Sequence, residues 1–298
     1  RDVLQAYGTN SGSDDVRSAL LRILGKLGSP ESLASLIKAL ESTSSQIRTA
    51  AAIALADWPT AQPIAALEAF VVKEKDPFIR KNAINSIGSL APLANDAPQE
   101  EIAQSLITAY AGSKDNIEQT AVLTALTRVT EPSTLAFFQE LSGKEPRRKP
   151  IADPAVKNLT AALAKVTTVA DSTTLAPANA DRTPGPLAVN AGAIANWFGL
   201  GDHVSWLVKL DQPGEYEVQV SQSYAGQKPG VYSVMFGSST MPKSVEKTSS
   251  ASDFRSISAG RARFSKAGHY RLWIRPQQIA PGDQLMRLKE VTLTRTGS

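Results

Sequence analysis

A repeat of about 31 residues is the feature that most restricts what this chain can fold into. The pairs Val16-Arg17, Ile47-Arg48 and Ile79-Arg80 recur at intervals of 31 and 32 residues, and each begins a run of apolar residues spaced three and four positions apart. That period is typical of amphipathic helices. A short break and a second apolar run follow each time, so the predicted unit is a pair of helices joined by a turn. One pair cannot bury its apolar face alone, so neighbouring pairs are expected to stack.

Further copies continue this pattern less regularly. A fourth copy covers residues 117–141 after an insertion near residues 95–100, and a half copy covers residues 156–166. Over residues 14–168 the period, the paired helices, the small residues and the arginine after the first apolar residue resemble HEAT repeats. The resemblance implies a multidomain chain of α and β type, in which an α-solenoid occupies residues 1–170.

Two short sequence segments make this resemblance to HEAT repeats more specific. Residues 20–28 and 54–59 are similar to the HEAT arrays of large exported proteins from planctomycetes and related bacteria. In those proteins the array is an accessory domain. The resemblance therefore implies a bacterial protein that is secreted, periplasmic or on the cell surface, with a protein partner on the HEAT surface.

The apolar period changes from 3.6 to 2 in the second part of the chain. Residues 171–186 lack periodicity and are rich in turn formers, so we predict a domain linker there. Residues 203–210 and 216–220 then alternate as half-buried strands do. Further strands are predicted at residues 231–236, 256–259, 262–264, 270–275 and 288–294, separated by turn signals. Many short strands of this kind indicate an antiparallel β-sandwich over residues 187–298.

Five short sequence segments in this part, taken in their order along the chain, show a second resemblance. They occupy residues 201–206, 213–218, 253–255, 267–270 and 285–293. Together they resemble galactose-binding-like sandwiches of the jelly-roll type that are appended to bacterial fucosidases and sulfatases, relatives of carbohydrate-binding modules. The resemblance implies a polysaccharide or glycan as partner.

Three aromatic residues are candidates for contact with a sugar. Trp197 and Phe198 precede the Gly199–Gly201 segment, and Tyr224 follows a predicted strand. In a loop, an aromatic ring can stack on the apolar face of a sugar. For Trp197, filling the core is the alternative.

Trp273 is a candidate for an interface. The alternation of residues 270–275 places it on the outward face between Arg271 and Arg275. An exposed tryptophan suggests a covering surface: a glycan, the helical array or a second chain. Stacking of arginine on the indole is the alternative.

Four acidic residues could supply oxygen ligands to a structural calcium ion, the one cofactor considered. They are Asp202, Glu217, Asp253 and Asp283. The sequence contains no calcium loop of the EF-hand type, and turn formation or solvation is the alternative for these side chains. With no cysteine and two histidines, a zinc site is not expected.

Composition and motifs argue against several functions. No apolar run is long enough to span a membrane, and there is neither a nucleophile elbow nor a phosphate-binding loop. The net charge of +4 is small and its basic residues are scattered, so nucleic acid is not an expected partner. We therefore expect a non-catalytic accessory or scaffold protein that binds carbohydrate, a protein partner, or both. The alternatives are the C-terminal non-catalytic part of a larger sulfatase or glycoside hydrolase, and a protein-interaction module without sugar binding.

Overall fold

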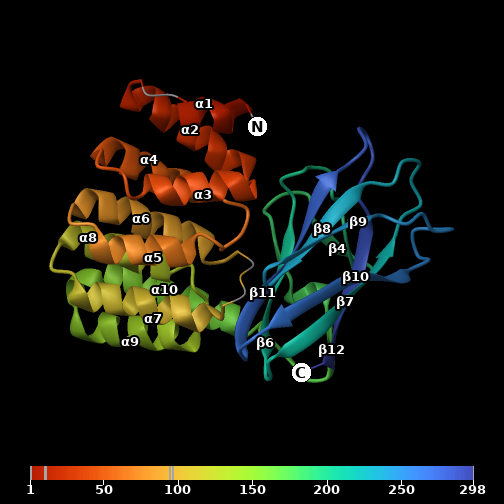
Figure 1. Ribbon diagram of the computed structural model, residues 1–298. Helices are drawn as coiled ribbons and strands as arrows, with labels where there is room; N and C mark the ends of the chain where they lie inside the picture. Colours follow the sequence, from red (N-terminus) through yellow and green to blue (C-terminus); the bar gives the residue numbers. More distant parts are fainter. Residues whose placement is uncertain (1, 10–11, 94, 96, 298) are drawn as a thin grey trace. The chain divides into compact units, whose positions relative to one another are not determined.

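The computed structural model describes residues 2–9, 12–93, 95 and 97–297. The chain divides into two compact units, each with its own core (Figure 1). The helical unit contains the described residues up to 93 and residues 99–160. The second unit, mostly strands, contains the few described residues of the segment 94–98 and those from 161 onward.

The helical unit is a stack of helix pairs. Its helices are α1 (Asp2–Thr9), α2 (Asp14–Leu27), α3 (Pro30–Ala39), α4 (Ser45–Leu55), α5 (Ile64–Lys73), α6 (Pro77–Leu90), α7 (Gln99–Gly112), α8 (Asn116–Leu126), α9 (Pro132–Lys144) and α10 (Lys149–Leu163). A 3-10 turn, Pro146–Arg148, precedes α10. The repeat predicted from sequence corresponds to α2 with α3, α4 with α5, α6 with α7 and α8 with α9; α1 was not predicted. None of these described helices has the length and apolar character that crossing a membrane requires.

The first helix of each pair begins at a capping side chain. Ser13, Ser44, Asp76 and Asp115 precede α2, α4, α6 and α8, and each accepts a hydrogen bond from a backbone N–H in the first turn. Such a cap satisfies a donor that the helix itself leaves free, and typically stabilises it by about 1 kcal/mol. The repeated cap therefore fixes where each repeat starts.

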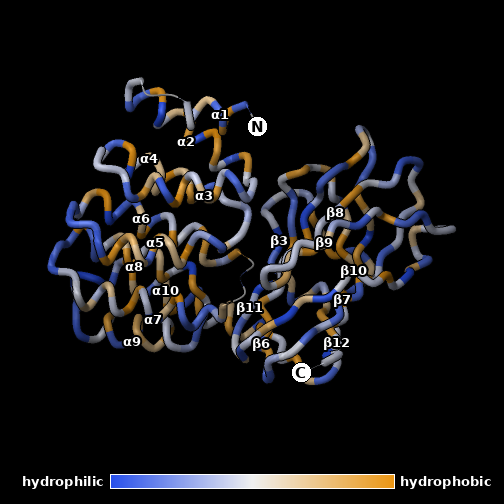
Figure 2. The backbone as a smooth tube through the Cα atoms, in the orientation of Figure 1, coloured by the Kyte–Doolittle hydropathy of each residue, from blue (hydrophilic) through white to orange (hydrophobic). Residues whose placement is uncertain are grey.

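Small residues let the first helices pack closely in series. A Cβ at Gly25 of α2 would lie 2.2 Å from the carbonyl oxygen of Ala54 in α4, and a Cβ at Gly88 of α6 would lie 2.7 Å from the Cα of Ala125 in α8. Helix α2 packs on α4, α4 on α6 and α6 on α8, whereas contacts between α3 and α5 are sparse. The apolar stripes of these helices form one continuous core, and apolar and hydrophilic stretches alternate along the chain (Figure 2).

The second unit is a sandwich of two sheets. Its strands are β1 (Thr167–Val169), β2 (Ser172–Leu175), β3 (Asp181–Arg182), β4 (Ala188–Asn190), β5 (Ala193–Ala195), β6 (Val204–Leu210), β7 (Gly214–Ser223), β8 (Val231–Phe236), β9 (Ser239–Ser244), β10 (Arg255–Phe264), β11 (Gly268–Gln278) and β12 (Arg287–Gly297). One sheet has the order β1-β6-β11-β8-β9, with β3 also beside β6, and the other has the order β10-β7-β12-β5-β4, with β2 also beside β12. All described pairs are antiparallel except β1 with β6. The predicted fold class, a helical-repeat solenoid followed by a β-sandwich, is confirmed.

The linker predicted at residues 171–186 is wrong. Strand β2 pairs with β12, and β3 pairs with β6, so this segment is part of the sandwich. Leu175 is fully buried, and the carbonyl oxygen of Ala176 accepts a hydrogen bond of 2.9 Å from the indole of Trp206. Strand β2 has one apolar residue, Leu175, and β3 has none, so neither strand shows an apolar period in the sequence. The connection between the last helix and the first strand is instead residues 164–166.

Candidate binding surfaces

One groove of the helical unit lies between α3 and α5 and has a volume of about 660 Å³. Ile37, Leu40, Ala66, Ala69 and Phe70 supply its apolar part. It exists because the first helices pack closely while α3 and α5 do not. Its size and apolar character are those of a ligand or partner site.

Charged side chains surround one end of the α3–α5 groove. Arg48 Nε lies 2.6 Å from Glu74 Oε2. Burial alone would favour the neutral acid, but the hydrogen bonds and charge of Arg48, together with backbone N–H groups of the following turn, lower the pKa of Glu74. Lys73 and Lys75 are exposed and, within the described part of the chain, form no ion pair. This end therefore offers two free cations beside Glu41, the remaining carboxylate of the lining.

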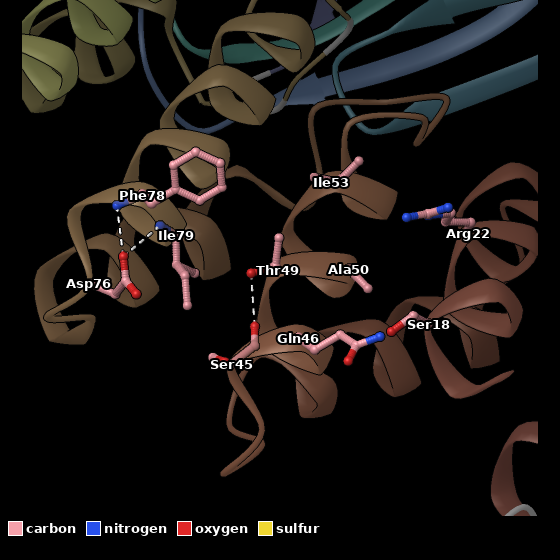
Figure 3. Close-up of a pocket in the computed structure, with 10 residues that line it drawn as sticks. All are labelled: Ser18, Arg22, Ser45, Gln46, Thr49, Ala50, Ile53, Asp76, Phe78 and Ile79. Atoms are coloured by element: carbon pink, nitrogen blue, oxygen red, sulfur yellow. Dashed lines mark hydrogen bonds between the residues drawn. The ribbon is translucent and has the colours of Figure 1, made fainter. Parts of the chain in front are cut away.

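A second groove, of about 290 Å³, crosses the first helices (Figure 3). Ser18 and Arg22 come from α2, Ile53 and its neighbours from α4, and Phe78 from α6. Ile53 and Phe78 are 43% and 61% exposed, so two apolar side chains stand open to solvent here. The full lining is Ser18, Arg22, Ser45, Gln46, Thr49, Ala50, Ile53, Asp76, Phe78 and Ile79.

The same groove recurs one step along the array. A hollow of about 260 Å³ lies between α6 and α8, with Lys81 and Asn85 from α6. The α8 side supplies Asn116, Ile117, Thr120, Ala121 and Thr124. Ile117 is 57% exposed. These positions were not predicted from the sequence, although a signal was present, because several of them are apolar or cationic residues on the solvent side of the predicted apolar stripe.

The structure contradicts two of the three predicted sugar contacts. Trp197 is fully buried and its indole N–H donates to the carbonyl oxygen of Ile194 at 3.4 Å. Tyr224 is 3% exposed and its hydroxyl donates to Asp283. Both rings belong to the sandwich core. Phe198, next to Trp197, is 57% exposed and is the one predicted aromatic residue that solvent reaches.

The bond between Tyr224 and Asp283 shifts both groups. Burial, and then the neighbouring Asp283 carboxylate, raise the pKa of Tyr224 to about 12. The hydrogen bond from Tyr224 lowers the pKa of Asp283. This pair connects the loop after β7 with the loop before β12.

The four predicted calcium ligands are not brought together. Each accepts hydrogen bonds from its own partner: Asp202 from the N–H groups of Phe198 and Gly199, Glu217 from Ser258, Asp253 from Ser249, and Asp283 from Tyr224. No group of three or more acidic or histidine side chains suited to a metal occurs among the described residues. The predicted ligand set is therefore wrong, because local turn and strand partners take the carboxylates.

Trp273 is 7% exposed, although the strand pattern predicted an outward, open side chain. The His203 ring lies 4.8 Å from the indole, and the Arg275 guanidinium lies 4.6 Å from it. Arg271 is tied to the sandwich by bonds of 2.8 Å to Asp181 and 3.1 Å to Ser205. The Arg275 guanidinium therefore stacks on the Trp273 indole, which is the alternative that the sequence left open for this residue. The interface role of Trp273, Arg271 and Arg275 stays a prediction.

Comparison with known proteins supports the helical part most directly. A family model described as HEAT repeats matches residues 2–88, so the predicted HEAT array is confirmed there. No curated protein matches the chain.

Several solved structures are similar to part of the chain. A β-(1,4)-mannanase from Podospora anserina that carries a family 35 carbohydrate-binding module is 12% identical, with 43% of this chain and 28% of that chain covered, and a TM-score of 0.35. A family 35 carbohydrate-binding module from Clostridium thermocellum is 14% identical over 43% of this chain and 100% of that chain, with a TM-score of 0.35. The C-terminal family 6 carbohydrate-binding module of a laminarinase from Zobellia galactanivorans is 13% identical, with 42% of this chain and 99% of that chain covered, and a TM-score of 0.33. This chain thus spans less than a third of the mannanase.

Proposed function

We propose that this chain is a non-catalytic scaffold whose helical array holds a protein partner in the α3–α5 groove. The observation that carries the proposal is the groove itself, about 660 Å³ with an apolar floor and cations at one end. Helical-repeat stacks commonly use their extended surfaces to bind other proteins. The partner segment is an amphipathic helix, since an apolar helix face fills a groove between two helices.

Charge suggests how such a helix would lie. Lys73 and Lys75 have no carboxylate partner among the described residues, so an acidic side chain of the partner would complement them. Ala66 and Ala69 are short and let a partner backbone come close.

Selection from a displayed peptide library tests this proposal on the whole protein. We expect enrichment of amphipathic helical sequences that carry an acidic residue near one end. Ala69→Arg, which fills the groove, should abolish their binding. Val72→Arg is the matched control, because Val72 lies on the same helix, is 84% exposed and does not line the groove. The proposal requires at least one selected peptide whose binding is lost with Ala69→Arg and kept with Val72→Arg. If no selected peptide behaves in this way, the proposal is wrong.

Glycan binding by the sandwich is the second candidate function. Its support is the sequence resemblance of residues 187–296 to carbohydrate-binding sandwiches, and the open ring of Phe198 beside Leu200, which is 63% exposed. A glycan array probed with the intact chain tests it. Binding that Phe198→Ala removes would support a sugar site at this loop, and the absence of any bound glycan would leave the sandwich as a protein-interaction module.

The place of the chain in a larger protein and in the cell is also a proposal. The resemblance to exported HEAT arrays supports a bacterial protein that works outside the cytoplasm. A role as the non-catalytic part of a larger sulfatase or glycoside hydrolase stays an alternative.

A further inference from the structure

The row of first helices presents a second surface, on different residues from the α3–α5 groove. Two of its exposed side chains, Arg22 of α2 and Ile53 of α4, each stand nine residues after the cap of their helix, which is Ser13 or Ser44. Lys81 of α6 lines the next hollow and stands five residues after its cap, Asp76. Successive helices therefore present a cation, an apolar side chain and a second cation, the second cation about one helical turn nearer the cap of its helix.

The charge of this surface is one-sided. Neither Arg22 nor Lys81 forms an ion pair with a carboxylate among the residues that the structure describes. The Lys81 ammonium lies 5.6 Å from the centre of the Phe78 ring. Asp76 is the one carboxylate in the lining of the two hollows, and it is engaged as a helix cap by the N–H groups of Phe78 and Ile79. The surface therefore complements an acidic partner.

The spacing of the helices selects the conformation of that partner. Packed helices lie about 8–10 Å apart, and α2, α4 and α6 pack in series. A polyproline II segment has three residues per turn and rises about 3.1 Å per residue, so every third side chain points the same way at intervals of about 9 Å. Its first, fourth and seventh side chains would thus meet three successive helices. An α-helix places its equivalent side chains only about 5–6 Å apart.

We propose that this surface binds a segment of another protein in the polyproline II conformation, with acidic residues at its first and seventh positions and an apolar residue at its fourth. The acidic side chains pair with Arg22 and Lys81, and the apolar side chain packs on Ile53 and Phe78. This goes beyond the proposed function, because it gives the array a second partner on a different surface, and so lets one chain bridge two proteins.

Fluorescence anisotropy with a synthetic peptide tests the proposal on the intact chain. The probe is Glu-Pro-Thr-Val-Pro-Thr-Glu, labelled at its N-terminus, and saturable binding is expected. Moving the second glutamate to the sixth position, or replacing both glutamates by lysine, should weaken binding at least tenfold. A helical peptide that binds equally well would overturn the proposed conformation, and absence of binding by the probe would overturn the proposal.

Charge reversal on the protein supplies the second arm. Arg22→Glu combined with Lys81→Glu should abolish binding of the glutamate peptide and create binding of the lysine peptide. That gain cannot come from loss of folding. Lys157→Glu is the control, because it reverses an exposed charge on α10 that lines none of the three grooves described above, and it should leave both peptides unaffected. Equal effects of Lys157→Glu and the double variant would show non-specific charge attraction and overturn the site. An effect of Ala69→Arg on the peptides of the displayed library bears only on the proposed function.

Discussion

Arg80 Nη2 lies 2.6 Å from Glu118 Oε1, and this ion pair joins the first helices of two successive repeats. The Glu118 side chain is only 5% exposed, while that of Arg80 is 29% exposed. Arg48, the same position one repeat earlier, pairs with Glu74. Arg48 and Arg80 thus each connect a first helix to a later part of the array, whereas Arg17, the first copy of this arginine, lies 3.9 Å from Asp14 on its own helix.

Arg80→Ala is expected to destabilise the helical unit by about 1–3 kcal/mol, because it leaves the carboxylate of Glu118 buried without its partner. Urea unfolding followed by circular dichroism at 222 nm measures this. A double variant, Arg80→Leu with Glu118→Leu, should recover part of the loss, since no buried charge is left unpaired. If the loss of stability in the double variant equals the sum of the losses in Arg80→Leu and Glu118→Leu alone, the pair does not act as a unit.

The close packing of the first helices predicts a different kind of defect. Gly25→Ala places a Cβ 2.2 Å from the Ala54 carbonyl oxygen, so α2 must move away from α4. We expect a loss of about 1–3 kcal/mol. Gly143→Ala is the matched control, because it lies within α9 and its Cβ would meet nothing within 4 Å. There the better helix propensity of alanine should leave stability unchanged or raise it by up to about 1 kcal/mol. Equal effects at the two glycines would contradict the packing explanation.

Periodicity made much of this fold predictable, and its absence marks where prediction failed. Long helices and the central strands carry many apolar residues at a fixed period, so their type and order were read correctly. Gly260 explains why one strand was read as two: it lies at a bulge in β10, with a φ of +137°. Strands β1 to β5 have two to four residues each, too few to show alternation.

The candidate site residues depended on tertiary contacts that a sequence does not display. Trp197 has the same local signals as an exposed loop aromatic. Its burial follows from pairing across the sandwich, where its carbonyl oxygen accepts a hydrogen bond of 2.9 Å from the N–H of Leu285. The arginine of the repeat was visible, but its acidic partners were not. Glu74 lies 26 residues after Arg48, and Glu118 lies 38 residues after Arg80.

Trp197 is buried and Phe198 is exposed, so removing the two rings should change the free energy of unfolding by very different amounts. Trp197→Ala should cost about 3–5 kcal/mol, because it empties a fully buried position in the sandwich core. Phe198→Ala should change stability by less than about 0.5 kcal/mol, as exposed substitutions usually do. Thermal unfolding of the two variants beside the parent chain measures both. A large loss at Phe198 would mean that this ring is covered in solution, and it would then no longer be a candidate for stacking on a sugar.

The bond between Tyr224 and Asp283 predicts how stability depends on pH. The folded pKa of Asp283 is below its ordinary value, so its contribution is present above about pH 4 and is lost as the pH falls through the folded pKa. The folded pKa of Tyr224 is raised from 10.0 to about 12, so its contribution is present below pH 10 and is lost as the pH rises toward 12. Tyr224→Phe removes the donor and with it both contributions. Urea unfolding across this pH range should therefore show the largest difference between the parent chain and Tyr224→Phe near neutral pH, and a smaller one at both extremes. Asp283→Asn should reproduce the acid side of this pattern, whereas a difference that stays constant from pH 3 to 11 would show that the lost hydroxyl acts only through packing.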